Sequence, residues 1–187
     1  MDRNPAKLAG ANPPPPPRGV QTFTLAEVDK IAAELGDKLG PVVQFAAATG
    51  LRPEEWIALE RQDVDRAAGI VRVARTHVSG RTKPHCKTSA SSRDVPLSAR
   101  ALAALDALPT RIDTRLLFPT ASGGHLHLEN FRRRDWKPAL EAAGVPYRRI
   151  YDLRSTFASH ALATGVSAFE LARTMGTSAG GDYQRAQ

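Results

Sequence analysis

The stretch from Tyr147 to Ser159, YRRIYDLRSTFAS, constrains this chain more than any other part of the sequence. Arg148 and Arg149 lead into a predicted helix start, and Arg154 lies one turn inside that helix. A helix N-terminus presents unpaired amide hydrogens, and a guanidinium adds a rigid fork of donors beside them. The sequence therefore predicts a binding place for a phosphate group, centred on Arg154.

A second arginine occupies a similar setting far upstream, in the stretch TGLRPEEWIAL that covers residues 49–59. Gly50 is expected to end one helix and Pro53 to open the next, because glycine favours helix ends and proline favours first turns. Arg52 then lies in the turn between these helices. Burial of the following apolar residues, beginning with Trp56, would hold the arginine in one orientation.

These two stretches resemble the segments around the two catalytic arginines of the tyrosine recombinases, the phage integrase family. The segment around that family's second arginine usually reads His-Asp-Leu-Arg-His-Thr-Phe-Ala-Ser, and residues 151–159 here read YDLRSTFAS. The stretch at 49–59 is similar to the segment around the first arginine, and the two occur in the family's order. The resemblance implies that Arg52 and Arg154 bind the scissile phosphate of DNA.

The chemistry that this resemblance implies is the breaking of a phosphodiester without a metal ion. Such a reaction requires a nucleophile, cations beside the strained phosphate and an acid for the leaving 5′ oxygen. Arg52 and Arg154 would supply the cations, since each guanidinium can grip two phosphate oxygens. The alternative is that both are surface arginines in ordinary ion pairs.

A lysine on a β-hairpin supplies the acid in this family, and the segment from Lys87 to Leu97, KTSASSRDVPL, is similar to that hairpin. The resemblance therefore assigns the acid to Lys87. Lys83, four residues earlier, is the competitor, and a solvated lysine on a flexible turn is the alternative. Glu55 aligns with the family's acidic residue and is expected to hold Arg52, with an ordinary helix N-terminal carboxylate as the alternative.

Two positions differ from the common pattern of the family. Tyr151 stands where most members have histidine, and Thr177 stands where most have histidine or tryptophan. One branch of integrase-like proteins is similar in carrying Tyr-Asp-Leu-Arg and Met-Gly-Thr-Ser, as this chain does. Both side chains keep a hydroxyl that can bond to a phosphate oxygen, although neither titrates near neutral pH as histidine does. Tyr151 could equally be an aromatic packed at the helix entry.

The family's nucleophile is a tyrosine that follows the position of Thr177 by nine residues, and here that position is Ala186. The tyrosine nearby is Tyr183, six residues after Thr177, in a glycine-containing segment that disfavours a helix. A shift of three residues displaces a helical side chain by about 4.5 Å and turns it by about 60°. Tyr183 is therefore either a nucleophile with unusual spacing or a terminal aromatic without a catalytic role. A frame shift or truncation after Ser178 is a further explanation.

The charge balance points to a polyanionic partner. The 187 residues contain 26 Lys and Arg against 19 Asp and Glu, which gives a net charge of +7 and a pI near 10.1, and DNA is the leading partner for such a domain. Cys86 is the single cysteine, so neither an internal disulfide nor a zinc site is expected, and no metal or nucleotide cofactor is implied. The absence of an apolar membrane span or signal peptide predicts a soluble cytoplasmic protein.

Capping residues and apolar periodicity predict a mainly α-helical domain with a small antiparallel β-sheet (α+β). Helices are expected over residues 24–35, 41–49, 53–59, 98–108, 129–143, 152–163 and 167–175. Capping boxes that begin at Thr24 and Ser167 are expected to open the first and last of these helices, which Gly36 and Gly176 end. Phe131 and Trp136 are expected on the inner side of the helix over 129–143. Strands are expected at 69–73 and 93–97, connected by the polar span 79–92. Basic side chains are expected to decorate the sheet, namely Arg81, Lys83, Lys87 and Arg93.

The N-terminal residues differ from the rest in composition. Residues 1–21 include the uninterrupted run from Pro13 to Pro17 and are predicted to form a polyproline II tail or linker. A start-site artefact and a ligand for a polyproline-binding partner are the alternatives. Residues 22–187 are predicted to form one tyrosine-recombinase catalytic domain, in which the last stretch after Ser178 is atypical.

The resemblance implies a site-specific recombinase or integrase that cuts one DNA strand through a 3′-phosphotyrosine and joins it to a new partner. Members of the family act as tetramers on DNA, which implies a homo-oligomer here. The leading alternative is a catalytically inactive DNA-binding remnant of an integrase. A basic helical domain with no nucleic-acid role is the third interpretation.

Overall fold

The computed structural model describes residues 21–84 and 92–176. Helices and strands follow one another in the order α1 (Leu25–Thr49), α2 (Pro53–Trp56), the 3₁₀ turn η2 (Arg61–Asp63), β1 (Val64–Asp65), β2 (Ile70–Val73), β3 (Arg75–Val78), β4 (Arg81–Pro84), β5 (Arg93–Pro96), α3 (Ala99–Asp106), α4 (Leu128–Phe131), the π turn η4 (Arg132–Trp136), α5 (Lys137–Ala142), α6 (Asp152–Ala163) and α7 (Ala168–Met175). The predicted class, mainly α with small antiparallel sheets, is confirmed.

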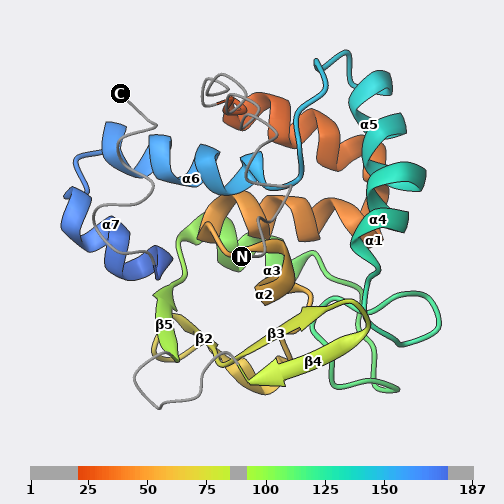
Figure 1. Cartoon of the computed structure of the whole chain (residues 1–187), viewed down its shortest axis with the longest axis horizontal. Coiled ribbons are helices and arrows are strands. Elements are labelled where there is room, and N and C mark those ends of the chain that lie inside the picture. Colours follow the sequence, from red (N-terminus) through yellow and green to blue (C-terminus); the bar gives the residue numbers. More distant parts are fainter. Residues whose placement is uncertain (1–20, 85–91, 177–187) are drawn as a thin grey trace, which may run out of the picture.

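Helix α1 is the centre of the helical layer, because α3, α5 and α6 all pack against it. Figure 1 shows α1, α5 and α6 on one side of the molecule and the strands on the other. The predicted capping box opens α1, with the Thr24 hydroxyl accepting from the Glu27 amide at 3.1 Å. Gly36 interrupts the helix as predicted, with φ of 68°, but Pro41 lies inside α1, so the predicted start at that residue was wrong.

Length alone does not make α1 a membrane helix. Its buried face carries residues such as Ile31 and Phe45, while its other face carries charged residues. Across residues 21–84 and 92–176, no helix combines the length and the hydropathy that crossing a bilayer requires.

The strands form two small antiparallel sheets. Strands β1, β2 and β5 form one sheet in that order, and β2 and β5 are the two predicted strands. Val71, Val73 and Val95 point from this sheet into the core and are fully buried. Strands β3 and β4 form a separate hairpin, and β4 falls within the span that was expected only to connect the predicted strands.

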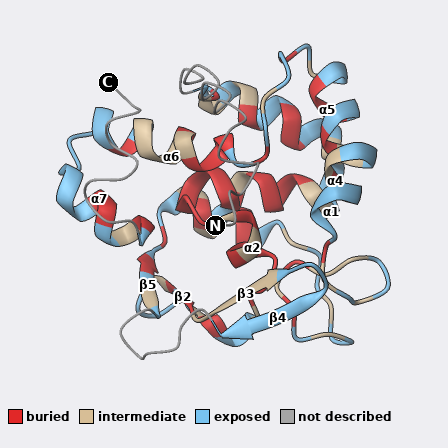
Figure 2. Cartoon of the chain, in the orientation of Figure 1, coloured by how far each residue is buried: buried red, intermediate tan, exposed pale blue. Residues whose placement is uncertain are grey.

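Aromatic rings join the elements that surround α2. Trp56 contacts Phe118 and Phe131 in edge-on geometry, each with centroids 6.4 Å apart. Phe118 in turn packs on Phe45 of α1 at 5.2 Å, and Phe131 packs on Trp136 at 6.4 Å. Figure 2 shows the buried residues concentrated in α1, α2 and the first turns of α6. The short helix α2 is therefore fixed from several sides, as the burial of Trp56 predicted.

The single helix predicted over 129–143 is interrupted. A π turn at Arg132–Trp136 separates α4 from α5, and the Lys137 amide donates to the Arg132 carbonyl five residues back. Pro138 has no amide hydrogen for the usual bond to the residue four positions earlier, which breaks the α-helical pattern here. Phe131 and Trp136 are nevertheless buried as predicted.

Candidate active site

The turn between α1 and α2 places the first predicted arginine. Gly50 ends α1 with φ of 64°, and Arg52 precedes Pro53, the first residue of α2. A Cβ atom at Gly50 would overlap the ring of Phe157 on α6. Glycine therefore serves two needs here, the left-handed conformation and the close approach of two helices. The approach brings Arg52 beside the helix that carries Arg154.

The carboxylate of Glu55 is fully buried below this turn. It accepts from the Arg52 amide at 2.8 Å and from Arg52 Nη1 at 3.0 Å, as predicted. The Arg93 fork donates to the same two oxygens, with Nη1 at 2.9 Å and Nη2 at 2.8 Å. Four donors thus surround one carboxylate, which fixes the planes of both guanidinium groups.

Arg93 is the residue of this site whose predicted place was wrong. It was expected on the surface of the sheet, but its side chain is only 12% exposed and points at Glu55. The alternation of the strand contained the signal, because Arg93 shares a face with Val95 and Leu97, which are both buried. An arginine on the inner face of a strand requires a buried partner, and Glu55 is that partner.

Arg154 lies in the first turn of α6 and is 2% exposed. Its Nη1 donates to the Gly50 carbonyl at 2.6 Å, and its Nη2 donates to the Met175 carbonyl at 2.8 Å. The Asp152 carboxylate accepts from the Arg149 amide at 2.7 Å and closes the start of α6. The predicted helix over 152–163 is confirmed, and it holds Arg154 against the ends of α1 and α7.

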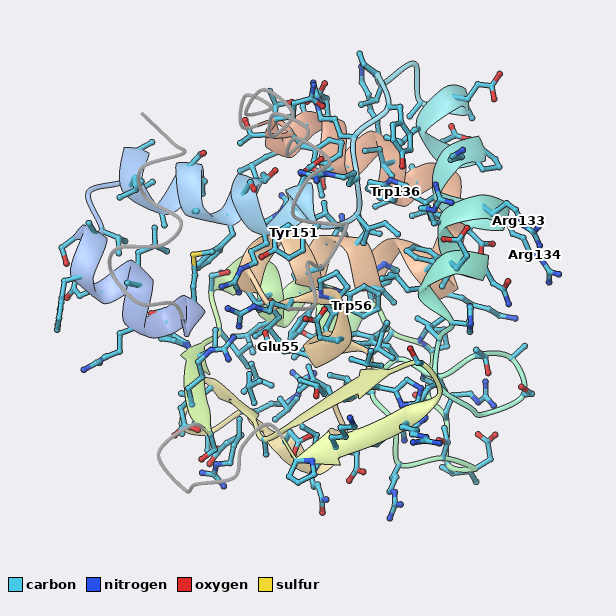
Figure 3. All side chains as sticks on the ribbon, viewed as in Figure 1. Glu55, Trp56, Arg133, Arg134, Trp136 and Tyr151 are labelled. Atoms are coloured by element: carbon cyan, nitrogen blue, oxygen red, sulfur yellow. The ribbon has the colours of Figure 1, made fainter. Side chains whose placement is uncertain are left out.

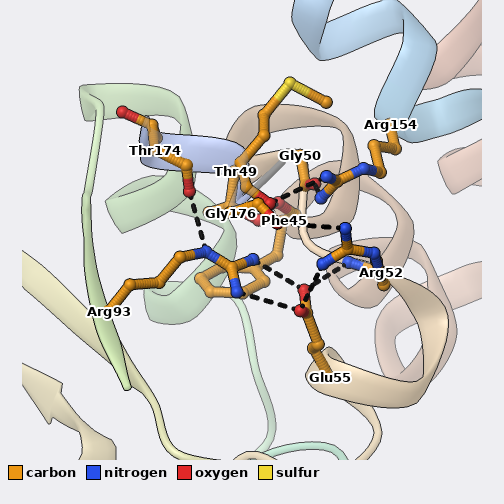
Figure 4. A network of polar contacts seen from close by, with 10 residues as sticks. Phe45, Thr49, Gly50, Arg52, Glu55, Arg93, Arg154, Thr174 and Gly176 are labelled. Carbon is orange, nitrogen blue, oxygen red and sulfur yellow. Dashed lines mark hydrogen bonds and ion pairs between the residues drawn. The ribbon is translucent and has the colours of Figure 1, made fainter. Parts of the chain in front are cut away.

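Three guanidinium groups meet at the C-terminal end of α7 (Figure 4). The last carbonyls of a helix lack intrahelical partners and carry partial negative charge. Each of three consecutive carbonyls accepts from a different arginine, Thr174 from Arg93 at 2.9 Å, Met175 from Arg154 at 2.8 Å and Gly176 from Arg52 at 3.2 Å. We call Arg52, Glu55, Arg93 and Arg154 the arginine cluster.

The arginine cluster carries more positive than negative charge. Burial lowers the pKa of Arg154 to about 10, and the neighbouring charge of Arg52 acts in the same direction. Partial burial opposes the charge of Arg52 as well, but Glu55 outweighs that effect and raises the pKa of Arg52. Guanidinium groups keep their charge at neutral pH, so three positive groups stand against one carboxylate. A bound anion would reduce this excess of positive charge.

Tyr151 lies at the start of α6, three residues before Arg154 (Figure 3). The residue is 40% exposed. It is close enough to act on the pKa values of both Arg52 and Arg154. Placement beside both arginines is compatible with the predicted contact to a phosphate, which stays a prediction.

Three predicted site residues lie outside the described parts of the chain, namely Lys87, Thr177 and Tyr183. The competitor lysine, Lys83, is described and lies exposed on β4, opposite Thr76. Of the six predicted site residues, the structure thus brings together Arg52, Arg154 and Tyr151. Within the same described ranges, no group of three or more His, Cys, Asp or Glu side chains is arranged to hold a metal ion.

Comparison with known sequences gives a family. The sequence model described as "Phage integrase family" matches residues 21–180. A prophage phiRv2 integrase of Mycobacterium tuberculosis is 30% identical over 195 residues, which cover 100% of this chain and 52% of that protein. A XerC-like tyrosine recombinase of Caldanaerobacter subterraneus is 26% identical over 187 residues, 85% of this chain and 48% of that protein. The chain spans about half the length of these relatives.

Comparison with solved structures gives the same fold. XerA recombinase matches with a TM-score of 0.72 at 20% identity, over 94% of this chain and 61% of that one. The Tn1549 transposon integrase in complex with circular intermediate DNA matches with a TM-score of 0.72 at 19% identity, over 86% and 60%. A lambda integrase dimer bound to a COC′ core site matches with a TM-score of 0.66 at 16% identity, over 89% and 48%.

Proposed function

Because this chain belongs to the phage integrase family, we propose that residues 22–187 form the catalytic domain of a site-specific DNA recombinase. One observation carries the proposal. Arg52 and Arg154 come from segments far apart in the sequence, yet both guanidinium groups converge on the end of α7, oriented by buried partners. Preorganised forks of this kind stabilise a charged phosphate transition state.

The proposed reaction begins with one DNA phosphate bound between Arg52 and Arg154, with the Tyr151 hydroxyl donating to a phosphate oxygen. The oxygen of a tyrosine attacks phosphorus in line as its phenolic proton passes to solvent water, and the bond to the 5′ oxygen breaks as Lys87 donates a proton to that oxygen. A 3′-phosphotyrosine results. Attack by the 5′ hydroxyl of another strand then restores the phosphodiester and frees the tyrosine. The protein linkage keeps the bond energy, so this scheme includes no cofactor.

The solved relatives support DNA as partner and a homo-oligomer as working form. The Tn1549 integrase was solved with DNA, and lambda integrase was solved as a dimer on a core site and as a tetramer on a Holliday junction. We extend both properties to this chain as part of the proposal, together with a cytoplasmic location. Residues 1–21 would act as a tail or linker beside the domain.

A second candidate function follows from the nucleophile position. Tyr183 comes six residues after Thr177, while the family's spacing leads to Ala186. A helical displacement of that size moves the attacking oxygen out of line. The second candidate is therefore a DNA-binding integrase remnant that grips phosphate through Arg52 and Arg154 without cutting.

Covalent trapping on nicked DNA separates the two candidates. A nick beside the cleavage site lets the short 5′ product diffuse away, so a covalent protein–DNA adduct accumulates. An adduct formed by the wild-type chain and lost in Tyr183→Phe supports the recombinase. DNA binding without an adduct supports the remnant. An absence of DNA binding would overturn both candidates. The control variant is Arg72→Lys, whose exposed side chain lies outside the arginine cluster and which should behave as the wild-type chain does.

A further inference from the structure

Arg93 makes more contacts inside the arginine cluster than the two-arginine chemistry requires. Its two Nη atoms bind both oxygens of Glu55, and its Nε donates to the Thr174 carbonyl at 2.9 Å. The side chain thus links strand β5, helix α2 and the last turn of helix α7. None of these contacts leaves the fork aimed at solvent, so Arg93 is placed to hold other residues.

The contacts of Arg93 also affect Arg52, because both arginines bind Glu55. Glu55 Oε1 accepts from Arg93 Nη1 and also from Arg52 Nη1, at 2.9 and 3.0 Å. Each of the two carboxylate oxygens is therefore shared between the two arginines, counting the Arg52 amide on Oε2. The plane of the carboxylate, and with it the direction of the Arg52 fork, depends on the bidentate grip of Arg93.

The same guanidinium also contacts the last turn of α7. Helix α7 packs against β5 and α6, and its carbonyls at Thr174 and Gly176 accept from Arg93 and Arg52. A Cβ atom at Gly176 would lie 3.0 Å from Arg93 Nη1, so the two groups are in close contact. A lysine at position 93 would keep the charge but could reach only one of these partners at a time.

From these contacts we propose that Arg93 is a positioning residue for the phosphate site, which orients Arg52 through Glu55 and fixes the last turn of α7. The phosphate part of this inference rests on the proposed function. Arg93 itself does not bind the phosphate. Loss of the Arg93 guanidinium would weaken phosphate binding only by misplacing Arg52. A residue that contacts the phosphate directly would not depend on Arg52 in this way.

The test uses Arg93→Lys in the full chain, with Arg72→Lys on the neighbouring strand as control. Arg72 pairs with Asp94 across the sheet, and the two side chains are 61% and 49% exposed. The first readout is the Nε–H NMR signal of Arg52 without DNA, assigned by its absence in Arg52→Lys. We expect Arg93→Lys to shift or broaden this signal and to speed amide exchange in the last turn of α7. Arg72→Lys should leave both unchanged.

The second readout is the affinity for a short labelled DNA duplex, since phosphate contacts do not require a specific sequence. Arg93→Lys should weaken binding about tenfold, as expected when a charged hydrogen bond is misplaced. In an Arg52→Lys background the same change should cost less than about twofold, because the effect passes through Arg52. Arg93→Gln is the second variant, in case the lysine variant does not fold.

The outcomes separate the inference from the proposed function. An unchanged Arg52 signal in folded Arg93→Lys and Arg93→Gln overturns the inference, whatever the DNA affinity. Equal affinity losses in the wild-type and Arg52→Lys backgrounds overturn it too, because Arg93 would then contact DNA independently. If the wild-type chain binds no DNA, the proposed function fails, and the NMR readout alone decides the positioning role.

Discussion

The chain contains two groups of three arginines, and they differ in how the fold uses them. Arg52, Arg93 and Arg154 come from three distant segments and meet around Glu55 and the end of α7. The residues of Arg132–Arg134 are neighbours in the π turn beside α4, and Figure 3 shows two of them pointing away from the molecule. Tertiary structure brings the first group together, while the residues of the second group are adjacent in the sequence.

The difference lies in what fixes each guanidinium. Every arginine of the cluster donates to a buried carboxylate or to backbone carbonyls, so its fork keeps one direction. Arg132 pairs with Glu129 at 2.6 Å, but both side chains are well exposed, at 39% and 59%. Exposed pairs of this kind exchange freely with water and salt. The cluster therefore suits a defined transition state, and the exposed group suits general attraction to an anionic surface.

The largest expected effect is on stability, from Glu55→Gln. The substitution removes the one carboxylate of the arginine cluster and leaves Arg93 without its charge partner. We expect a loss of about 3 kcal/mol in the free energy of unfolding, because a buried pair broken on one side leaves an uncompensated charge. Urea denaturation measures it. Glu129→Gln is the matched control in the exposed group, and an equal loss in both variants would remove the distinction between them.

The next effect tests how the backbone assembles the cluster, with Gly50→Ala. A methyl group there must tolerate φ of 64° and overlaps Phe157. We expect a loss of about 2–3 kcal/mol, the sum of the left-handed strain and the displaced ring. Gly69→Ala is the control, since Gly69 has φ of 65° and a Cβ atom added there would meet nothing within 4 Å. It should lose only about 1 kcal/mol. Equal losses in both would show that strain alone accounts for the effect.

Local sequence signals predicted several helix ends, missed others such as the start placed at Pro41, and predicted the arginine cluster only in part. The capping pairs at Thr24 and Ser167, and the terminal glycine at Gly176, depend on residues within a turn of each other, so their pattern can be read directly. The hairpin of β3 and β4 was not predicted because its residues are partly or fully exposed and show no alternation of buried and exposed positions.

The buried partner of Arg93 could not be predicted by the same means. The strand of Arg93 was predicted correctly, and the parity with Val95 indicated an inward side chain. The partner Glu55, however, lies 38 residues away, and no local pattern connects a strand residue to a short helix at that distance. Arg52 and Arg154 were found because their segments resemble two segments of the phage integrase family. Such a resemblance indicates that distant residues act at one site, which helix and strand propensities cannot show.

A third prediction, which rests on the proposed function, concerns DNA affinity. It compares the loss of a guanidinium group in the arginine cluster with the same loss in the exposed group. Arg154→Lys keeps the charge but cannot donate to Gly50, Met175 and a phosphate together, so we expect binding to a DNA duplex to weaken about tenfold. Arg133→Lys should change the affinity by less than about twofold, because an exposed cation acts chiefly by its charge. Fluorescence anisotropy measures both. Equal losses would mean that Arg154 also acts by charge alone.

The smallest expected effect is on the salt dependence of DNA affinity. Here substitutions in the exposed group should have a larger effect than a substitution in the arginine cluster. Arg133→Gln combined with Arg134→Gln removes two exposed cations. The slope of log affinity against log salt should therefore become shallower by up to about 1.8, or about 0.9 for each DNA phosphate that is no longer neutralised. Arg154→Lys retains its charge, so its slope should stay at the wild-type value even though its affinity is lower. Titrations at several salt concentrations measure both quantities. A slope unchanged by the double substitution would show that Arg133 and Arg134 lie off the DNA path and that other cations of the chain supply the attraction.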